Sequence, residues 1–437
     1  MTFEGANISR RAVLGGAGLA MTAGAGCLAG ALSPSARASD WPQQGYDAGH
    51  TNYKPTGSPP LDRPRLAWQA GAVRVTARDD DIGTGLRQPG MIVADGTIVT
   101  KRGTAIGLDT GDIRTRSGCF QDGRIGFART ESYTDGIIVS STLDAGRQFG
   151  GPDGARLYGV RPSIPTGVGD RCENARRWIA GSPRDGSYQY TGTVDDGTVF
   201  GAVWPTEFGE SRGAVVAFDA DDGSRQWRTD VTLDVESVCA DDERLFVTGS
   251  DGDLTIFERG SGFPKQGFAI DETDVLVAAR EGTAYLRTSN RAIERQEVMP
   301  TLSAVDGSAG ELSWRVTPAD LLESDDARPS FGGFAVGPDS VYVLIETRGG
   351  DYCVSLSTTD GSVQWSRSVS AAPWLVATDT SVYLSGGSVA CLDSATGEER
   401  WTWSPPDDYI PGGPIVIAND RLLVPIDGRA LYALEER

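Results

Sequence analysis

A short pattern recurs along the chain: an Asp after an apolar segment, a Gly four residues later, and a Trp four residues after that. Residues 389–401 contain it as Asp393, Gly397 and Trp401. An Asp side chain can accept a hydrogen bond from the backbone two residues on, and Gly tolerates the positive φ of a tight turn. Each copy therefore predicts a strand, a tight turn and a second strand whose Trp is buried.

The number of copies makes this pattern a repeat. The other complete copies are Asp219/Gly223/Trp227 and Asp306/Gly310/Trp314. A fourth copy has Ser357 in place of the Asp, followed by Gly361 and Trp365. Two partial copies are Asp109/Gly111, which is shortened and has no Trp, and Glu258/Gly262, with Gln266 at the Trp position. A repeat at a fixed spacing constrains the fold more than any other feature of a sequence.

A second pattern, an acidic turn followed by a short apolar strand, gives the number of repeats. It begins eight times, at Asp95, Asp135, Asp196, Asp242, Glu281, Asp339, Asp379 and Asp420. Each interval has room for four short strands, which is typical of propeller blades. The two longest intervals predict insertions at residues 145–174 and 317–330, the second with a short helix at Leu321 and Leu322.

The last repeat stops before its turn and Trp strand, whereas residues 65–70 carry an unpaired Trp68 strand near the other end. A blade completed by both ends would close the ring and remove its open edges. The sequence therefore predicts an all-β, eight-bladed propeller of four-stranded antiparallel blades over residues 65–437, closed by the N-terminal strand. Residues 39–64 are expected to be an irregular segment.

Residues 1–38 are expected to be an export signal and tether. Ser9, Arg10 and Arg11 begin a match to the twin-arginine signal, and an uncharged Gly- and Ala-rich stretch follows. Residues 25–27 resemble a lipobox, in which Cys27 would be lipidated. The alternative is cleavage after Ala38, which follows an A-x-A pattern. We expect a lipoprotein on the outer face of the cytoplasmic membrane, or otherwise a secreted protein.

The charge excludes some classes of partner. The formal net charge is −20 and the isoelectric point is near 4.5. Such a surface keeps a protein soluble and argues against nucleic acid as a partner. The basic residues are almost all Arg, and so acidic a chain with so little Lys resembles the proteins of salt-loving archaea. His50 is the only histidine, which excludes a metal site built from several histidines.

The cysteines give no metal or redox motif, because none forms a C-x-x-C pair. Cys239, Cys353 and Cys391 lie in predicted strands and are expected to be buried free thiols. Cys119 and Cys172 lie in predicted loops of neighbouring blades, and in an oxidising compartment they could form a disulfide.

The repeat resembles that of the PQQ-like, or quinoprotein-type, family of eight-bladed propellers, whose blades carry A-x-D-x-x-T-G-x-x-x-W. Asp393, Thr396, Gly397 and Trp401 follow this pattern, with Cys391 at the Ala position. The copy at Asp219 lacks the Thr. The resemblance covers nearly all of the chain after the signal. It implies that these Trp residues pack between neighbouring blades and are not part of a site.

The family resemblance leaves several functions open, because one fold hosts many activities. Quinoprotein dehydrogenases hold PQQ and Ca²⁺ in the central funnel and usually carry a vicinal disulfide, but this sequence has no Cys-Cys pair. The BamB-like lipoproteins instead hold partner proteins with their propeller loops. We expect an exported, monomeric, non-enzymatic scaffold without a cofactor, which binds a protein or envelope component. The alternatives are a PQQ- and Ca²⁺-dependent dehydrogenase and a small-ligand binding or sensing protein.

We expect the loops and channel mouths to carry the binding activity, because ligands often bind at the centre of a propeller. The candidate segments are residues 87–89, 129–131, 188–190, 373–374 and 409–411.

Overall fold

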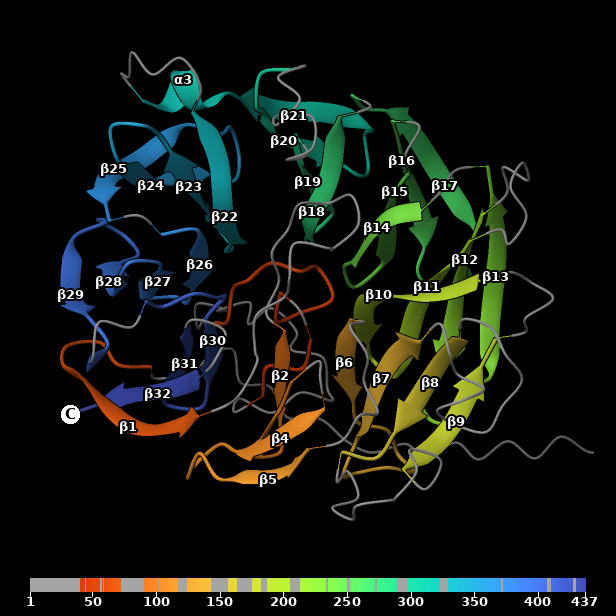
Figure 1. Ribbon diagram of the computed structural model, residues 1–437. Coiled ribbons are helices and arrows are strands. Elements are labelled where there is room, and N and C mark those ends of the chain that lie inside the picture. The colour runs from red at the N-terminus through yellow and green to blue at the C-terminus, as the bar shows by residue number, and fades with distance from the viewer. Residues whose placement is uncertain are drawn as a thin grey trace, which may run out of the picture. The chain divides into compact units, whose positions relative to one another are not determined.

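The structure is a computed structural model. It describes residues 40–43, 45–55, 57, 59–71, 90–100, 103–116, 124–142, 156–162, 175–181, 187–204, 213–232, 235–249, 252–271, 273–288, 298–322, 329–370, 372–406, 410–426 and 430–437. All of these residues belong to one compact unit, Ser33–Arg437. They form eight four-stranded antiparallel sheets, arranged as blades around a common centre (Figure 1). The predicted all-β, eight-bladed propeller is confirmed.

The first four blades follow one another along the chain. Blade 1 consists of β2 (Met91–Ala94), β3 (Thr97–Thr100), β4 (Thr104–Gly107) and β5 (Ile113–Arg116). Blade 2 consists of β6 (Ile125–Ala128), β7 (Ile137–Thr142), β8 (Arg156–Val160) and β9 (Arg176–Ala180). Blade 3 consists of β10 (Ser187–Asp195), β11 (Thr198–Trp204), β12 (Gly213–Asp219) and β13 (Arg225–Val231). Blade 4 consists of β14 (Val235–Ala240), β15 (Arg244–Gly249), β16 (Asp253–Glu258) and β17 (Pro264–Ala269).

The other four blades complete the ring. Blade 5 consists of β18 (Asp274–Arg280), β19 (Thr283–Thr288), β20 (Leu302–Asp306) and β21 (Glu311–Val316). Blade 6 consists of β22 (Ser330–Val336), β23 (Ser340–Glu346), β24 (Asp351–Ser357) and β25 (Val363–Val369). Blade 7 consists of β26 (Trp374–Ala377), β27 (Ser381–Ser385), β28 (Val389–Asp393) and β29 (Glu399–Trp403). Blade 8 consists of β30 (Val416–Ala418), β31 (Arg421–Ile426), β32 (Ala430–Glu436) and β1 (Pro64–Gly71).

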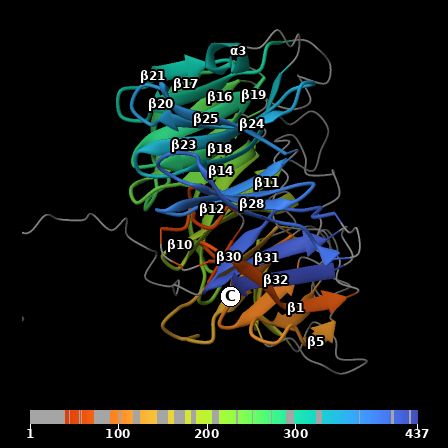
Figure 2. The same cartoon turned by 90° about the vertical axis from the view of Figure 1, so that its left-hand side faces the viewer.

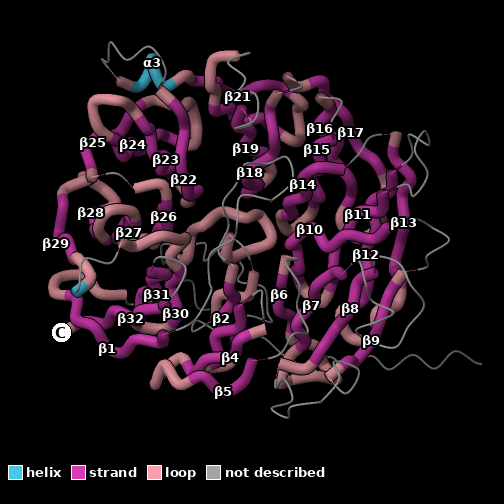
Figure 3. The backbone as a smooth tube through the Cα atoms, in the orientation of Figure 1, coloured by secondary structure: helices cyan, strands magenta, loops and turns pink. Residues whose placement is uncertain are grey.

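The position of a strand within its blade follows from its sequence. Several innermost strands are short and apolar, and every residue of β2, β6 and β30 is buried. The outermost strands are mostly polar, and in β13 the only buried side chain is that of Trp227. Strands covered on both faces need continuous apolar runs, whereas an outer strand buries only the residue that faces the next blade. Figures 2 and 3 show this arrangement of strands from the side and as a backbone tube.

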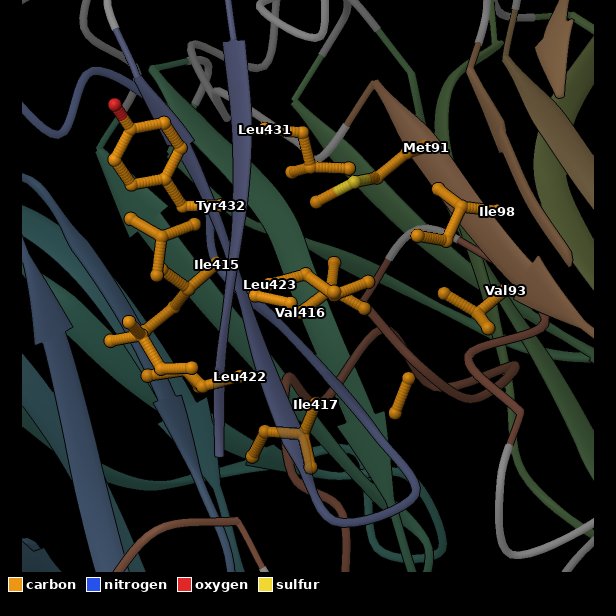
Figure 4. Packing of buried hydrophobic residues seen from close by; sticks show 14 of the residues in the cluster. Met91, Val93, Ile98, Ile415, Val416, Ile417, Leu422, Leu423, Leu431 and Tyr432 are labelled. Carbon is orange, nitrogen blue, oxygen red and sulfur yellow. The ribbon is translucent and has the colours of Figure 1, made fainter. Parts of the chain in front are cut away.

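The ring closes through blade 8, as the sequence predicts. Strand β1 is the outer strand of this blade and pairs antiparallel with β32, from Pro64 with Glu436 to Gly71 with Ala430. The core around this closure is continuous across three blades and includes Val376 of blade 7, Val416 of blade 8 and Met91 of blade 1. Figure 4 shows the part of this cluster around Met91, Val416 and Leu431. The two ends of the propeller are therefore joined both by a strand pair and by a shared core.

The repeated Asp and Gly form the predicted turn. Oδ1 of Asp393 accepts hydrogen bonds from the backbone N–H groups of Ala395 and Thr396, at 3.0 and 2.9 Å. Gly397 has a φ of +69°, and Gly223, Gly310 and Gly361 have similar values. The turn therefore depends on the two properties that the sequence analysis assigned to it.

The repeated Trp joins one blade to the next, as the family resemblance implies. The indole Nε1 of Trp365 in blade 6 donates to the carbonyl oxygen of Ser394 in blade 7, at 2.9 Å. A Cβ on Gly397 would lie 2.5 Å from Cε3 of Trp365. The same pairing recurs at Trp68/Gly111, Trp178/Gly223, Trp227/Gly262 and Trp314/Gly361. The Gly thus serves both its own turn and the Trp of the preceding blade, a second role that the sequence analysis missed.

Three joints in the ring differ from this rule. The outer strand of blade 1, β5, has no Trp. In blade 4, Nε2 of Gln266 replaces the indole and donates to the carbonyl oxygen of Ala309, at 3.3 Å, while Phe268 packs on Gly310. In blade 7, Trp401 donates to the carbonyl oxygen of Pro60, at 3.0 Å. Blade 8 has no such turn between β32 and β1, because these strands come from opposite ends of the chain. Pro59 and Pro60 occupy the position of the missing turn.

The two predicted insertions have different outcomes. Residues 145–174 are not a single inserted loop, because they include β8, the third strand of blade 2. The short helix predicted in the second insertion is confirmed as α3 (Pro318–Leu321), whose buried residues are Pro318 and Leu321. Within the described residues, no helix has the length and apolar character needed to span a bilayer.

Candidate functional site

The described residues before β1 form isolated bridges, turns and bends, and they lie against the propeller. Residues 40–57, which we call the belt, follow the ends of the innermost strands around the centre of the propeller (Figure 1). Because all innermost strands run in the same direction, their last residues meet at one mouth of the channel, which we call the belt mouth. The opposite mouth, where the innermost strands begin, we call the far mouth.

The belt contacts every blade in order. It pairs by backbone with β2 at Val93 and accepts hydrogen bonds from N–H groups of the innermost strands of blades 2, 4, 5, 6 and 7. These bonds are Phe127 to Pro42, Ala240 to Ala48, Ala279 to Gly49, Val336 to Thr51 and Ala377 to Asn52. In blade 3 the side chain of Gln43 bonds both the N–H and the carbonyl of Val194, at 2.7 and 2.9 Å. In blade 8, Nζ of Lys54 donates a hydrogen bond to the carbonyl oxygen of Ile417.

The belt holds a backbone conformation that few sequences tolerate. Tyr46, His50 and Asn52 have φ values of +78°, +55° and +53°. A Cβ on Gly49 would lie 2.0 Å from the carbonyl oxygen of Ala279, so only Gly fits there. Non-Gly residues with positive φ are strained and persist only where the surroundings fix them. The contacts with the blades provide that constraint.

A buried ionic group joins the two ends of the belt. Lys54 is fully buried, and its Nζ donates to the carbonyl oxygens of Asp40 and Ile417, at 3.0 and 3.1 Å. The carboxylate of Asp40 in turn pairs with Nη1 of Arg129, at 2.5 Å. Burial lowers the pKa of Lys54 to about 8, an effect that the Asp40 carboxylate opposes. The start and the end of the belt are therefore tied together beneath blades 1 and 8.

A second polar group lies in the middle of the belt. The Asp47 carboxylate accepts hydrogen bonds from the backbone N–H and the hydroxyl of Thr51, at 2.9 and 2.6 Å. Burial raises the pKa of Asp47 to about 6, despite these bonds and the attraction of Arg280. The ring of His50 lies 3.3 Å from Oγ1 of Thr193 and 3.7 Å from Sγ of Cys239. These contacts place His50 in a fully buried structural position.

Some of the side chains described at the far mouth are partly or largely exposed. Trp374 at the start of β26 is half-buried, and Ile410 before β30 is 56% exposed. Glu346 at the end of β23 is exposed. Arg287 is buried nearby and donates to the carbonyl oxygens of Phe331 and Gly332, both at 3.0 Å. Burial lowers the pKa of Arg287 to about 10, and the Glu346 carboxylate opposes this shift.

The segments predicted to lie at channel mouths have mixed outcomes. Residues 129–131 are at the belt mouth, where Arg129 is bound to Asp40. Residues 373–374 and 410–411 are at the far mouth. The prediction that Tyr188 lines the channel is wrong. Its side chain is buried against Phe218, in a core cluster shared by blades 2 and 3. Residues 87–89 and 409 lie outside the described residues.

The other predicted site residues separate into two groups. Cys239, Cys353 and Cys391 are buried free thiols, as predicted. Arg10, Arg11, Cys27, Cys119 and Cys172 lie outside the described residues, so the export signal, the lipidation and the disulfide stay predictions. In the part of the chain that the structure describes, no group of three or more His, Cys, Asp or Glu side chains could hold a metal ion. None of these residues is therefore assigned to Ca²⁺.

Two parts of the chain, residues 170–266 and 298–405, match the sequence profile of a protein family described as outer membrane protein assembly factor BamB. These parts contain all three complete copies of the Asp–Gly–Trp repeat. The match supports the PQQ-like propeller family. In the comparison with curated proteins, no relative was found.

Solved structures with the same fold include members of both functional branches. BamB from Moraxella catarrhalis aligns at a TM-score of 0.50 and 12% identity, over 85% of this chain and 100% of that one. The quinohemoprotein alcohol dehydrogenase from Pseudomonas putida HK5 aligns at 0.56 and 13%, over 91% and 80% of the two chains. A europium-containing methanol dehydrogenase aligns at 0.55 and 12%, over 91% and 98%. At these identities the likeness shows the fold alone.

Proposed function

We propose that this protein is an exported, non-enzymatic propeller, anchored by a lipid at Cys27, that binds a protein or another envelope component. The observation that carries the proposal is the match of residues 170–266 and 298–405 to a family described as an assembly factor. The structure adds that one mouth of the channel is occupied by the chain's own belt. Because the belt is bonded to the strand ends of this mouth, the remaining surface of the propeller is left for binding.

Capture of partners tests this function. Tagged protein is purified from detergent extracts of its own cells at high salt, and the proteins that copurify are identified by mass spectrometry. We expect the same partner in repeated captures and its absence from captures with an unrelated acidic propeller. If nothing specific copurifies, and if deletion of the gene leaves every envelope complex intact, the scaffold proposal is wrong.

The structural likeness to the two dehydrogenases favours one alternative, a PQQ- and Ca²⁺-dependent enzyme. The described residues do not fit this alternative well, because they contain no cluster able to hold the metal ion and the belt spans one mouth. A rise in melting temperature with PQQ and Ca²⁺, together with dye-linked oxidation of alcohols or sugars, would favour the enzyme. We expect neither.

The lipid anchor has its own test. Replacing Cys27 by Ser removes the thiol that the lipid would modify, so the protein should move from the membrane fraction to the medium. The control variant is Cys239→Ser, which removes a buried thiol of the propeller and should leave the location unchanged. Continued membrane retention of the Cys27→Ser protein would contradict lipid anchoring.

A further inference from the structure

The joint between blades 1 and 2 lacks the contact that fastens most other joints. At five joints an indole donates to a backbone carbonyl of the next blade. Blade 1 has no Trp anywhere between residues 91 and 116, so it has no indole to offer blade 2. Apolar packing does not compensate, because every pair of neighbouring blades shares a buried cluster and this pair has only an equivalent one. A polar contact must therefore take the place of the indole.

The carboxylate of Asp40 supplies a polar contact across this joint. Its Oδ1 accepts a hydrogen bond from the backbone N–H of Asp95, which follows β2 of blade 1, at 3.1 Å. Its Oδ2 accepts from Nη1 of Arg129, which follows β6 of blade 2, at 2.5 Å. The Asp40 side chain is fully buried and that of Arg129 is 12% exposed. A charge-assisted bond shielded from water in this way is stronger than one at the surface.

The same residue also reaches blade 8. The backbone carbonyl of Asp40 accepts from Nζ of Lys54, which donates as well to the carbonyl oxygen of Ile417 in blade 8. We propose that Asp40 is a latch. It holds blades 1 and 2 together in place of the missing indole, and without it the ring opens at this joint before it opens elsewhere. The latch concerns the ring itself and is independent of the scaffold function proposed above.

A second ion pair provides a matched control. Asp195 of blade 3 lies 2.6 Å from Nη1 of Arg259 in blade 4, and both side chains are 15% exposed. This joint also has the indole of Trp227, which donates to the carbonyl oxygen of Arg259 at 3.1 Å. Loss of the Asp195 carboxylate would leave that indole in place. The two ion pairs therefore differ in whether an indole supports the same joint.

Buried thiols can report which joint opens. Ala94 and Ala240 are the last residues of the innermost strands β2 and β14, and each is 2% exposed. They belong to the apolar clusters of joints 1–2 and 3–4, respectively, so Ala94→Cys and Ala240→Cys place one thiol in each joint. The native Cys353 and Cys391 are fully buried in blades 6 and 7 and serve as internal references. Labelling with N-ethylmaleimide in native buffer is followed position by position by mass spectrometry.

The latch predicts a local effect. Asp40→Asn places a carboxamide N–H group, or a singly bonded oxygen, where two bonds to the carboxylate now exist, so Arg129 or Asp95 loses its partner. We expect the thiol at position 94 to react at least tenfold faster in this variant, while Cys353 and Cys391 stay within twofold of their former rates. Arg129→Gln should have the same local effect, and the double variant should be no worse than the more severe single one. Asp195→Asn should leave the thiol at position 240 within twofold.

Three outcomes would overturn the latch. The first is an equal acceleration at position 94, Cys353 and Cys391, because Asp40 would then stabilise the whole ring and no single joint. The second is an unchanged rate at position 94 in both Asp40→Asn and Arg129→Gln. The third is a tenfold acceleration at position 240 in Asp195→Asn, which would show that the indole does not keep a joint closed. If Asp40→Asn does not fold, Arg129→Gln carries the test, since it changes a partly exposed side chain at the end of a strand.

Discussion

The joint between blades can be tested at a single turn that contains two glycines. Gly262 in blade 4 has a φ of +67°, and an added Cβ would lie 2.3 Å from Cε3 of Trp227 in blade 3. Gly260 in the same turn has open space where its Cβ would be. Gly96 has a φ of +70° but also has open space around it. Replacing each by Ala thus separates backbone strain from the clash with the indole.

The expected costs follow from these geometries. At Gly96 only the left-handed conformation is penalised, which costs about 1–2 kcal/mol. At Gly262 the indole must also move, which adds about 1–3 kcal/mol of overpacking and weakens the 3.1 Å bond from Nε1 of Trp227 to the Arg259 carbonyl. The total is about 2–5 kcal/mol. Gly260→Ala should stay within about 0.5 kcal/mol of the wild type.

Urea unfolding followed by Trp fluorescence measures these differences. The order of the midpoints should be Gly260→Ala, then Gly96→Ala, then Gly262→Ala, from most to least stable. A Gly262→Ala protein as stable as Gly96→Ala would show that the indole does not depend on this glycine. The proposed role of the repeat in joining the blades would then be wrong.

Two further predictions concern the belt. Asp47 has a pKa of about 6 in the folded protein, above its ordinary value of 3.8, so its contribution to stability is present below pH 4 and is lost as the pH rises through 6. Urea unfolding measures the free energy of unfolding of Asp47→Asn relative to that of the wild type. This difference should rise by up to about 3 kcal/mol between pH 4 and pH 7.5. A difference that stays constant with pH would contradict the burial of this carboxylate. Lys54 should resist acetylation at pH 8.5 while the exposed Lys265 reacts, although the low pKa of Lys54 would favour its reaction if it were accessible. Mass spectrometry distinguishes the sites, and equal labelling would show that the belt does not cover Lys54.

The repeat was predictable from the sequence because its residues act within a few positions of one another. Asp393 and Gly397 build a local turn, so their spacing alone indicates it. Trp68 could be assigned to the last blade because the repeat left one strand missing. The partner of each Trp was not predictable, since the indole contacts a Gly roughly 40 residues further on in the next blade. Spacing within one hairpin has no information about that contact.

The belt was missed for a different physical reason. Its residues follow no period, because each one meets the end of a different blade at a different angle. The bonds that hold it run mostly through its backbone carbonyls, to which the side-chain sequence is almost indifferent. Only a few positions show a constraint, such as Gly49, where a Cβ cannot fit, and Lys54, one of three lysines in the chain. These signals are too sparse to specify a path without the propeller.

The belt and β1 close the ring at its centre and at its outer edge, respectively. Strand β1 joins the last blade to the first part of the chain at the outer edge, while the belt ties the innermost strand ends together at the centre. Residues 59–60 connect the two elements, and the carbonyl of Pro60 accepts the Trp401 indole in place of the missing turn of blade 8. Opening the joint between blades 7 and 8 would therefore disturb both the indole contact with Pro60 and the belt, which bonds to Ala377 of blade 7 and Ile417 of blade 8. From this coupling we expect the whole ring, and not the single blade, to unfold as one cooperative unit.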